Sequence, residues 1–269
     1  MLSIFKKEIR TYFTTITGYG FSGFLVLITG YFFVSQNIAA ANANYNETLA
    51  GTMIMFLILV PVLTMRLFAE ETRQKTDQLL FSAPIKITDI VGGKFLAAIA
   101  LYLIGMAITL VFPFMLSRFG DMDWGMTIVG LFGYFMMGAC LISVGLFISV
   151  LTDNQIVAAA ATFAVVFVLL MMDNIASSAP ITVAASLIFV TIIILAIALL
   201  IYSSTKNLPL AGIFTLLCLV ITGVLYLFKP NLFDGVIVSV LGWFSVLNRF
   251  ENFYMGIVSI SDIIYYITF

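Results

Sequence analysis

Residues that could do chemistry are scarce in this chain, and more than a third of them gather in one stretch. The chain has 12 Lys and Arg residues, 13 Asp and Glu residues and no His. Nine of these 25 charges lie between Arg66 and Lys94, among them the adjacent carboxylates Glu70 and Glu71. Two carboxylates at a helix end can belong to a metal-dependent protease site, but such a site needs further ligands that this sequence lacks. The stretch is better suited to contacts with another protein than to catalysis.

Other catalytic and binding motifs are missing from the sequence. Without His, the chain cannot form a Ser-His-Asp triad, a Cys-His pair or an HExxH zinc site. Gly92-Gly93-Lys94 lacks the upstream glycine and the following hydroxyl of a phosphate-binding loop. Cys140 and Cys218 lie in different apolar stretches, which favours packing over a disulfide or a metal pair. We therefore expect no enzyme activity, no catalytic, cofactor or metal residue, and no ATP bound by this chain.

The elements that must position the charged stretch are hydrophobic helices. The chain is 62% hydrophobic and 9% charged, which is the composition of a membrane protein. A helix needs about 20 residues to cross a bilayer, and the backbone must satisfy its own hydrogen bonds there. Seven stretches of 17 to 26 residues carry no charge: Gly18–Val34, Leu49–Met65, Phe95–Leu116, Met126–Leu151, Ile156–Met172, Ile181–Tyr202 and Leu208–Phe228.

An eighth apolar stretch runs from Ile257 to Phe269, and its 13 residues would span roughly 20 Å. We expect an all-helical polytopic membrane protein of about eight spans, the last one incomplete, in one membrane domain over residues 1–269. The basic residues favour a cytoplasmic N-terminus, because nine of the twelve then lie inside and only Arg118, Lys229 and Arg249 outside. The net charge of −1 gives no basic face for a nucleic acid.

Residues 1–17 predict an amphipathic elbow helix on the inner leaflet. Lys6, Lys7 and Arg10 would anchor it at the membrane interface, with Glu8 on the same polar face. A simple topology anchor for the first span is an equally good interpretation. Gly18 and Gly20 would permit a bend into that span. The apolar face would hold Leu2, Phe5, Ile9, Tyr12, Phe13 and Ile16.

The cytosolic segment 66–94 predicts a short helix between two spans. Asp77–Ser82 has helix-forming residues, and Pro84 disfavours helix at the residue before it. Thr88 can cap the following helix. A solvated loop is the alternative, but the apolar cluster Leu79–Phe81 argues against it, because exposed apolar patches usually meet a partner. We expect this segment to dock a second protein.

The outer segment 229–256 is apolar in its middle but too short to span. Gly235–Leu247 has 13 residues and charges on both sides, which favours a re-entrant or interfacial hairpin. Aromatic residues of this segment suit the headgroup boundary. We expect the hairpin to lie before the last helix, on the outer side.

The bare spans also bear on the source of energy. Proton-coupled carriers place ionisable groups within the membrane, whereas here only Asp262 lies in an expected helix, near its outer end. Sodium-coupled carriers can use backbone carbonyls, so a stand-alone secondary carrier or channel stays open. A non-transporting scaffold subunit is a third possibility. The simplest account places the motor in a separate protein.

Segment 66–84 resembles the permease subunits of type-2 ABC exporters, nearest their gliding-motility and nitrous-oxide-accessory branch. In that family an arginine, Phe-Ala-Glu-Glu, a Thr-x-Glu-x-Leu-Leu run and a proline follow the second span. Lys75 stands here where glycine is usual, and Asp77 where glutamate is usual. Residues 181–228 have no counterpart in the usual six-span plan and are expected to be a two-helix insertion. The matching residues are Arg66, Phe68–Glu71, Thr76, Leu79, Leu80 and Pro84.

The resemblance implies a bacterial permease of the inner, cytoplasmic membrane that moves its substrate outward. It implies two cytosolic ABC ATPase subunits, which bind the ATP, and a second copy of this chain or a sister permease. Lys6, Lys7 and Arg10 would anchor the elbow. The residues that would couple the ATPase to the spans are Glu70, Glu71, Thr76, Asp77, Leu79, Leu80 and Pro84.

Overall fold

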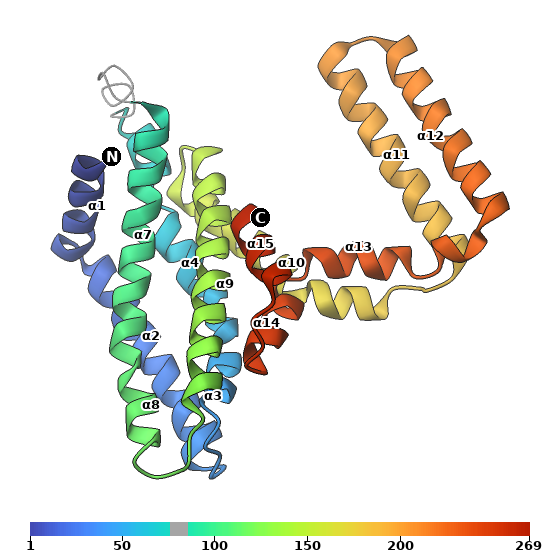
Figure 1. The fold of residues 1–269 in the computed structure, drawn as a ribbon. Helices are drawn as coiled ribbons and strands as arrows, with labels where there is room; N and C mark the ends of the chain where they lie inside the picture. Colours follow the sequence, from blue (N-terminus) through green and yellow to red (C-terminus); the bar gives the residue numbers. More distant parts are fainter. Residues whose placement is uncertain (76–85) are drawn as a thin grey trace. The chain divides into compact units, whose positions relative to one another are not determined.

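The computed structural model describes residues 1–75 and 86–269 of the chain (Figure 1). In these two ranges every regular element is a helix. Seven of the described helices are long and apolar enough to cross a membrane. They comprise α2 with η1 (Ile16–Ile38), α3 to α5 (Tyr45–Arg73), α7 with α8 (Ile87–Leu116), α9 (Trp124–Val150), α10 (Gln155–Ser178), α11 (Val183–Thr205) and α12 (Leu208–Phe228).

Each of the seven uncharged stretches in the sequence overlaps one of these helices, which confirms the prediction of a polytopic helical membrane protein. The expected eighth span is α15, a helix of nine residues and therefore too short to cross. The remaining bounds are α1 (Leu2–Thr14), α2 (Ile16–Phe32), η1 (Phe33–Ile38), α3 (Tyr45–Thr52), η2 (Met53–Met55), α4 (Phe56–Thr64), α5 (Ala69–Arg73), α7 (Ile87–Thr109), α8 (Val111–Leu116), η3 (Pro230–Phe233), α13 (Val236–Phe244), α14 (Val246–Tyr254) and α15 (Ile260–Thr268).

The chain divides into two compact units. Unit 1 comprises Met1–Leu170 together with Val246–Phe269, and unit 2 comprises Met171–Ser245. The expected outer segment 229–256 contains η3 and α13 of unit 2 and α14 of unit 1. Its middle is helical over nine residues and breaks at Ser245, where the backbone is extended. Whether this segment re-enters the membrane stays a prediction.

Helix α1 lies where the sequence predicted the elbow helix, and one residue separates it from the first span. Thr15 is extended (φ −104°, ψ 162°) between α1 and α2. Gly18 lies against the backbone carbonyl of Tyr12, where a Cβ would come within 2.5 Å of the oxygen. Gly20 has open space around it, so of the two glycines expected to permit a bend only Gly18 lies in a close contact at this break.

Helix α9 is the centre of unit 1, and it packs against α3, α4, α7, α14 and α15. Its glycines leave room for side chains of these neighbours, as small residues do where membrane helices approach closely. A Cβ at any of four α9 glycines would overlap a side chain from another helix. The pairs are Gly130 with Asn46, Gly133 with Phe253, Gly138 with Tyr102, and Gly145 with Thr64.

Unit 2 is built on the antiparallel hairpin of α11 and α12 (Figure 1). Lys206 ends α11 in the left-handed conformation (φ 51°), and the Asn207 side chain accepts a hydrogen bond from the Leu210 amide to begin α12. Only Ser186, Ile194 and Ala198 of α11 are buried. The two helices pack against each other, but few side chains of α11 are buried by this contact.

Candidate functional site

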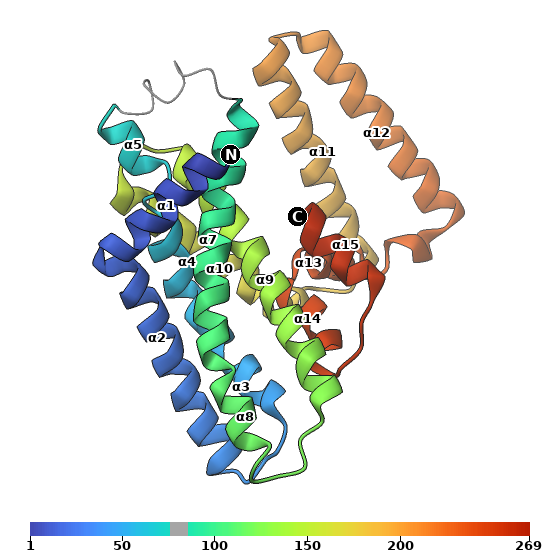
Figure 2. The same cartoon turned by 60° about the vertical axis from the view of Figure 1, so that its left-hand side comes forward.

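Charged side chains from three segments meet at one end of unit 1. The segments are α1 before the first span, the chain from Arg66 through α5 after the second, and the first turns of α7 (Figure 2). Helix α1 packs along α7, and the Tyr12 hydroxyl donates to the Leu63 carbonyl in α4 (3.1 Å). We call the following residues the charged cluster: Lys7, Glu8, Arg66, Glu70, Glu71 and Lys94.

Lys94 in α7 is the centre of the charged cluster and is only 1% exposed. Its Nζ lies 3.1 Å from Oε1 of Glu8 and 2.9 Å from Oε2 of Glu71. It also donates to the Leu67 carbonyl, so the three protons of the ammonium meet three acceptors. The ring of Phe68 covers the ammonium, with its centroid 5.0 Å from Nζ. A buried charge is tolerated only with such partners, so Lys94 ties α1 and α5 to α7.

Glu71 carries a second ammonium on its other oxygen. Nζ of Lys7 donates to Oε1 of Glu71 at 2.9 Å. Partial burial lowers the pKa of Lys7, but the hydrogen bond and charge of Glu71 outweigh it, and the pKa is raised overall. The Lys7 side chain is largely exposed, so this outer pair contributes at most about 1 kcal/mol. The buried pair with Lys94 dominates the link between the segments.

Glu70 has a different set of partners from Glu71. Its Oε2 accepts from Nε of Arg66 at 2.9 Å, and Nη1 of Arg66 donates to the Thr17 hydroxyl at the start of α2 (3.1 Å). The first amides of α5 are bound as well, because those of Phe68 and Ala69 both donate to the buried Ser149 hydroxyl of α9 at 3.2 Å. Helix α5 is thus tied to α1, α2, α7 and α9.

The charged cluster borders a cleft of about 250 Å³ at the surface. Charged and polar residues line the cleft, and their cations and carboxylates face one another. Among the residues that the structure describes, no group of three His, Cys, Asp or Glu side chains could hold a metal. The ion pairs of the charged cluster connect the helices mechanically. The cleft beside them exposes polar groups that a protein partner can contact.

One comparison with known proteins decides the family. The family model described as ABC-2 family transporter protein matches residues 2–182, about two thirds of the chain. The chain belongs to this family. The match includes α1, the charged cluster and the first five spans. No curated protein and no solved structure matches the chain.

As an ABC-2 protein, the chain is a permease subunit of an ABC transporter, and an ATPase subunit is the kind of partner that such permeases take. Of the residues predicted to couple the two, Glu70 and Glu71 lie in the charged cluster. Five others lie outside the described residues: Thr76, Asp77, Leu79, Leu80 and Pro84.

The three predicted interface anchors of the permease differ in environment. Lys7 binds Glu71, whereas Lys6 and Arg10 are exposed. The sequence placed Glu8 on the polar face of the elbow, and that placement is wrong. Glu8 is buried with Ile4 and Tyr12 on the face that α7 and α4 cover.

Glu8, Arg66 and Lys94 are the cluster residues that the sequence analysis missed as site residues, although Arg66 was among the residues that match the family motif. The spacing of four between Ile4, Glu8 and Tyr12 was a signal for a common face. Lys94 was counted only as a cytoplasmic charge, although it is the last charge before a bare stretch. A lysine at that position has to reach an acceptor or water, and here it reaches Glu8.

At the other end of unit 1, polar contacts bind α14 to α15 and to α3. Asp262 of α15 is 1% exposed and accepts from Nη1 of Arg249 (3.0 Å) and Nδ2 of Asn252 (2.7 Å). The buried Asn46 donates to backbone carbonyls of α9 and α14, and Tyr254 donates to Glu47. Asp262 is therefore a paired structural carboxylate.

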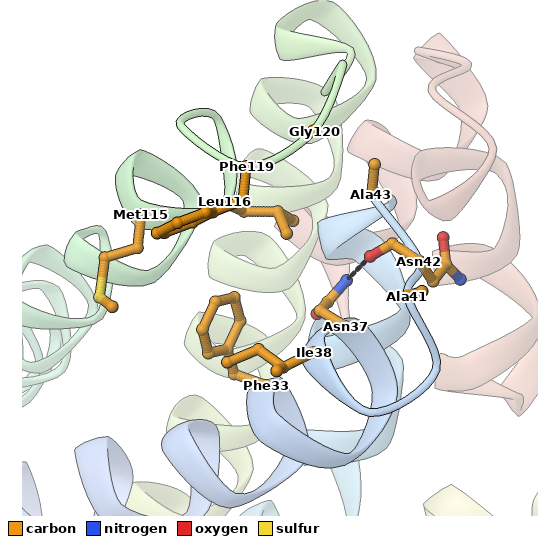
Figure 3. A pocket seen from close by; sticks show the side chains of 10 residues that line it. All are labelled: Phe33, Asn37, Ile38, Ala41, Asn42, Ala43, Met115, Leu116, Phe119 and Gly120. Atoms are coloured by element: carbon orange, nitrogen blue, oxygen red, sulfur yellow. Dashed lines mark hydrogen bonds between the residues drawn. The ribbon is translucent and has the colours of Figure 1, made fainter.

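An apolar pocket of about 510 Å³ also lies at that end, between η1, the loop after it and the end of α8 (Figure 3). The ring of Phe33 packs on Phe112 at 5.1 Å. The Asn37 amide donates to the carbonyls of Asn42 (2.8 Å) and Asn44 (2.9 Å), so this polar group is already satisfied. The pocket offers apolar contact and no reactive group.

Proposed function

We propose that this ABC-2 permease is the membrane half of an exporter, driven by a separate cytosolic ATPase that docks on segment 66–94. The observation that carries the proposal is the charged cluster. Its residues Glu70 and Glu71 precede residues 76–85 in the chain and Lys94 follows them, and over these residues the sequence resembles the ATPase-docking element of type-2 exporters. Within these exporters, the segment resembles the gliding-motility and nitrous-oxide-accessory branch.

The charged cluster explains how a push on this segment would reach the membrane. Helix α5 continues the second span, α1 leads into the first, and α7 is the third. Because Lys94 is buried, separating it from Glu8 and Glu71 together would leave its charge without a carboxylate partner, at a cost of about 3–5 kcal/mol. The three segments therefore move together, and a displacement of α5 reaches three spans at once.

The orientation and the assembly are part of the proposal. Nine of the twelve basic residues lie inside if the N-terminus is cytoplasmic, which puts the charged cluster on the ATPase side of the inner membrane. A second copy of the chain, or a sister permease, would complete the translocation path. The bare spans support an external motor over a proton-coupled carrier.

Docking is tested by placing charge on the predicted docking helix. Leu79→Asp with Leu80→Asp should abolish co-purification of the ATPase, because apolar contacts of that segment would be lost. Phe119→Asp is the matched control, since Phe119 is an exposed apolar residue beyond the other end of the α7–α8 span. ATPase association that survives the double change would overturn the docking role.

Sidedness is tested independently of docking. Single cysteines replacing Lys86 and Phe119, in a chain without Cys140 and Cys218, should react with an impermeant maleimide from opposite sides of the membrane. Lys86 should be labelled only in inside-out vesicles. Labelling of Lys86 from the periplasmic side would reverse the proposed orientation and the direction of export.

A further inference from the structure

A groove of about 500 Å³ lies between the start of α1 and the first half of α7. Gly93 brings α1 close to α7, because a Cβ there would meet Ile4 at 3.1 Å. Beside this contact the two helices diverge, and only apolar side chains line the space. They are Met1, Leu2, Phe5, Leu96, Ile99, Ala100 and Leu103.

The groove opens on the surface of a membrane-spanning helix. Leu96 and Leu103 lie within the α7 span and are exposed on the protein, as is Leu2 across the groove. Within the bilayer such a surface is in contact with acyl chains. A groove left empty there would forfeit dispersion contacts along its walls, so a hydrocarbon chain is the occupant that its position favours.

Two cationic residues come after the groove-lining residues in the sequence of α1. Leu2, Lys6 and Arg10 are spaced by four residues and therefore form one stripe of the helix. Lys6 and Arg10 are exposed, and in the described parts of the chain neither forms an ion pair. Lys7 differs, because Glu71 binds it. The acidic residue of α1, Glu8, is turned to Lys94 and does not neutralise the stripe.

We propose that this groove binds an anionic phospholipid of the leaflet next to α1. One acyl chain lies along Leu96 and Leu103, and the phosphate meets Lys6 and Arg10. Lys6 and Arg10 follow the groove-lining residues on α1, and an apolar groove beside two exposed cations is complementary to a molecule with a tail and a negative head. The lipid then bridges α1 and α7, the same two helices that Lys94 and Glu8 join.

The test counts lipids retained by the full-length chain, purified in mild detergent with phosphatidylglycerol or phosphatidylcholine. Native mass spectrometry should show one phosphatidylglycerol held in preference to phosphatidylcholine. Free glycerol phosphate should not compete, because the tail supplies the contact with the groove. Equal retention of the two lipids, or displacement by glycerol phosphate, would overturn the proposal.

Variants separate the head contact from the tail contact. Lys6→Gln with Arg10→Gln should lower the preference for phosphatidylglycerol about 30-fold, or roughly 5-fold for each charge. Lys206→Gln with Lys229→Gln removes the same charge from exposed positions elsewhere and should leave the preference unchanged. Ala100→Leu fills the groove and should reduce retention of both lipids. An unchanged preference in the first variant, or an equal loss in the control pair, would show that no specific site exists.

Discussion

In unit 1, 56% of the residues in the most apolar stretch of α9 are buried against other helices. In unit 2, none of the described residues in the most apolar stretch of α12 is buried. Both helices are long and apolar, so hydropathy alone does not separate them. The difference lies in their partners. Helix α9 has glycines that receive side chains from four other helices, while Gly212 and Gly223 of α12 have open space around them.

This comparison teaches where the shape of the permease is encoded. Unit 1 specifies its packing through its own side chains and contains the charged cluster. The family match ends at residue 182, so α11 and α12 lie beyond it. The interpretation of residues 181–228 as a two-helix insertion into the six-span plan stays a prediction. Helices with so few buried side chains depend on lipid or another protein to cover them.

The largest expected difference between the units comes from removing one lysine from each. Lys94→Met should destabilise the permease by about 3–5 kcal/mol, because Glu8 and Glu71 lose the buried ammonium. Lys206→Met in unit 2 should change stability by less than about 0.5 kcal/mol, since Lys206 is exposed. Thermal unfolding in detergent micelles measures both. Glu8→Gln and Glu71→Gln should recover part of the loss in the Lys94→Met chain, and equal effects of the two lysines would erase the contrast.

A smaller difference is expected from adding one methyl group inside unit 1. Gly138→Ala places a Cβ 2.5 Å from the ring of Tyr102, whose hydroxyl donates to the Tyr134 carbonyl. Such overpacking costs about 1–3 kcal/mol. Tyr102→Leu in the same chain should relieve the overlap, which a double-mutant cycle on unfolding free energies would detect. Additive losses would mean that the two residues do not touch.

The smallest effect is expected from the same substitution in unit 2. Gly212→Ala and Gly223→Ala meet no heavy atom within 4 Å, so stability should change by less than about 1 kcal/mol, in the favourable direction of helix propensity. The same unfolding assay in micelles applies. A clear loss at either glycine, seen in native membranes but not in micelles, would sharpen the comparison by showing that α12 packs on a partner there.

The spans of this protein follow from composition, because a bilayer forces an uncharged stretch of sufficient length into a helix. For the same reason the charged segment near Glu70 and Glu71 could be placed between two spans before any packing was known. The partner of Lys94 could not be predicted in this way. Glu8 is 86 residues away in the sequence, and it reaches Lys94 because Gly93 lets α1 approach α7.

Helix α1 shows the same limit. Its amphipathic pattern predicted an apolar face and a polar face, but two environments compete for a helix at a membrane boundary. One apolar face of α1 can contact lipid. The stripe of Ile4, Glu8 and Tyr12 is buried against α7 and, at Tyr12, against α4. A buried glutamate is stable on that stripe only because Lys94 lies opposite. Hydropathy is a property of each residue by itself, whereas the partner of a charged side chain depends on which helices pack together.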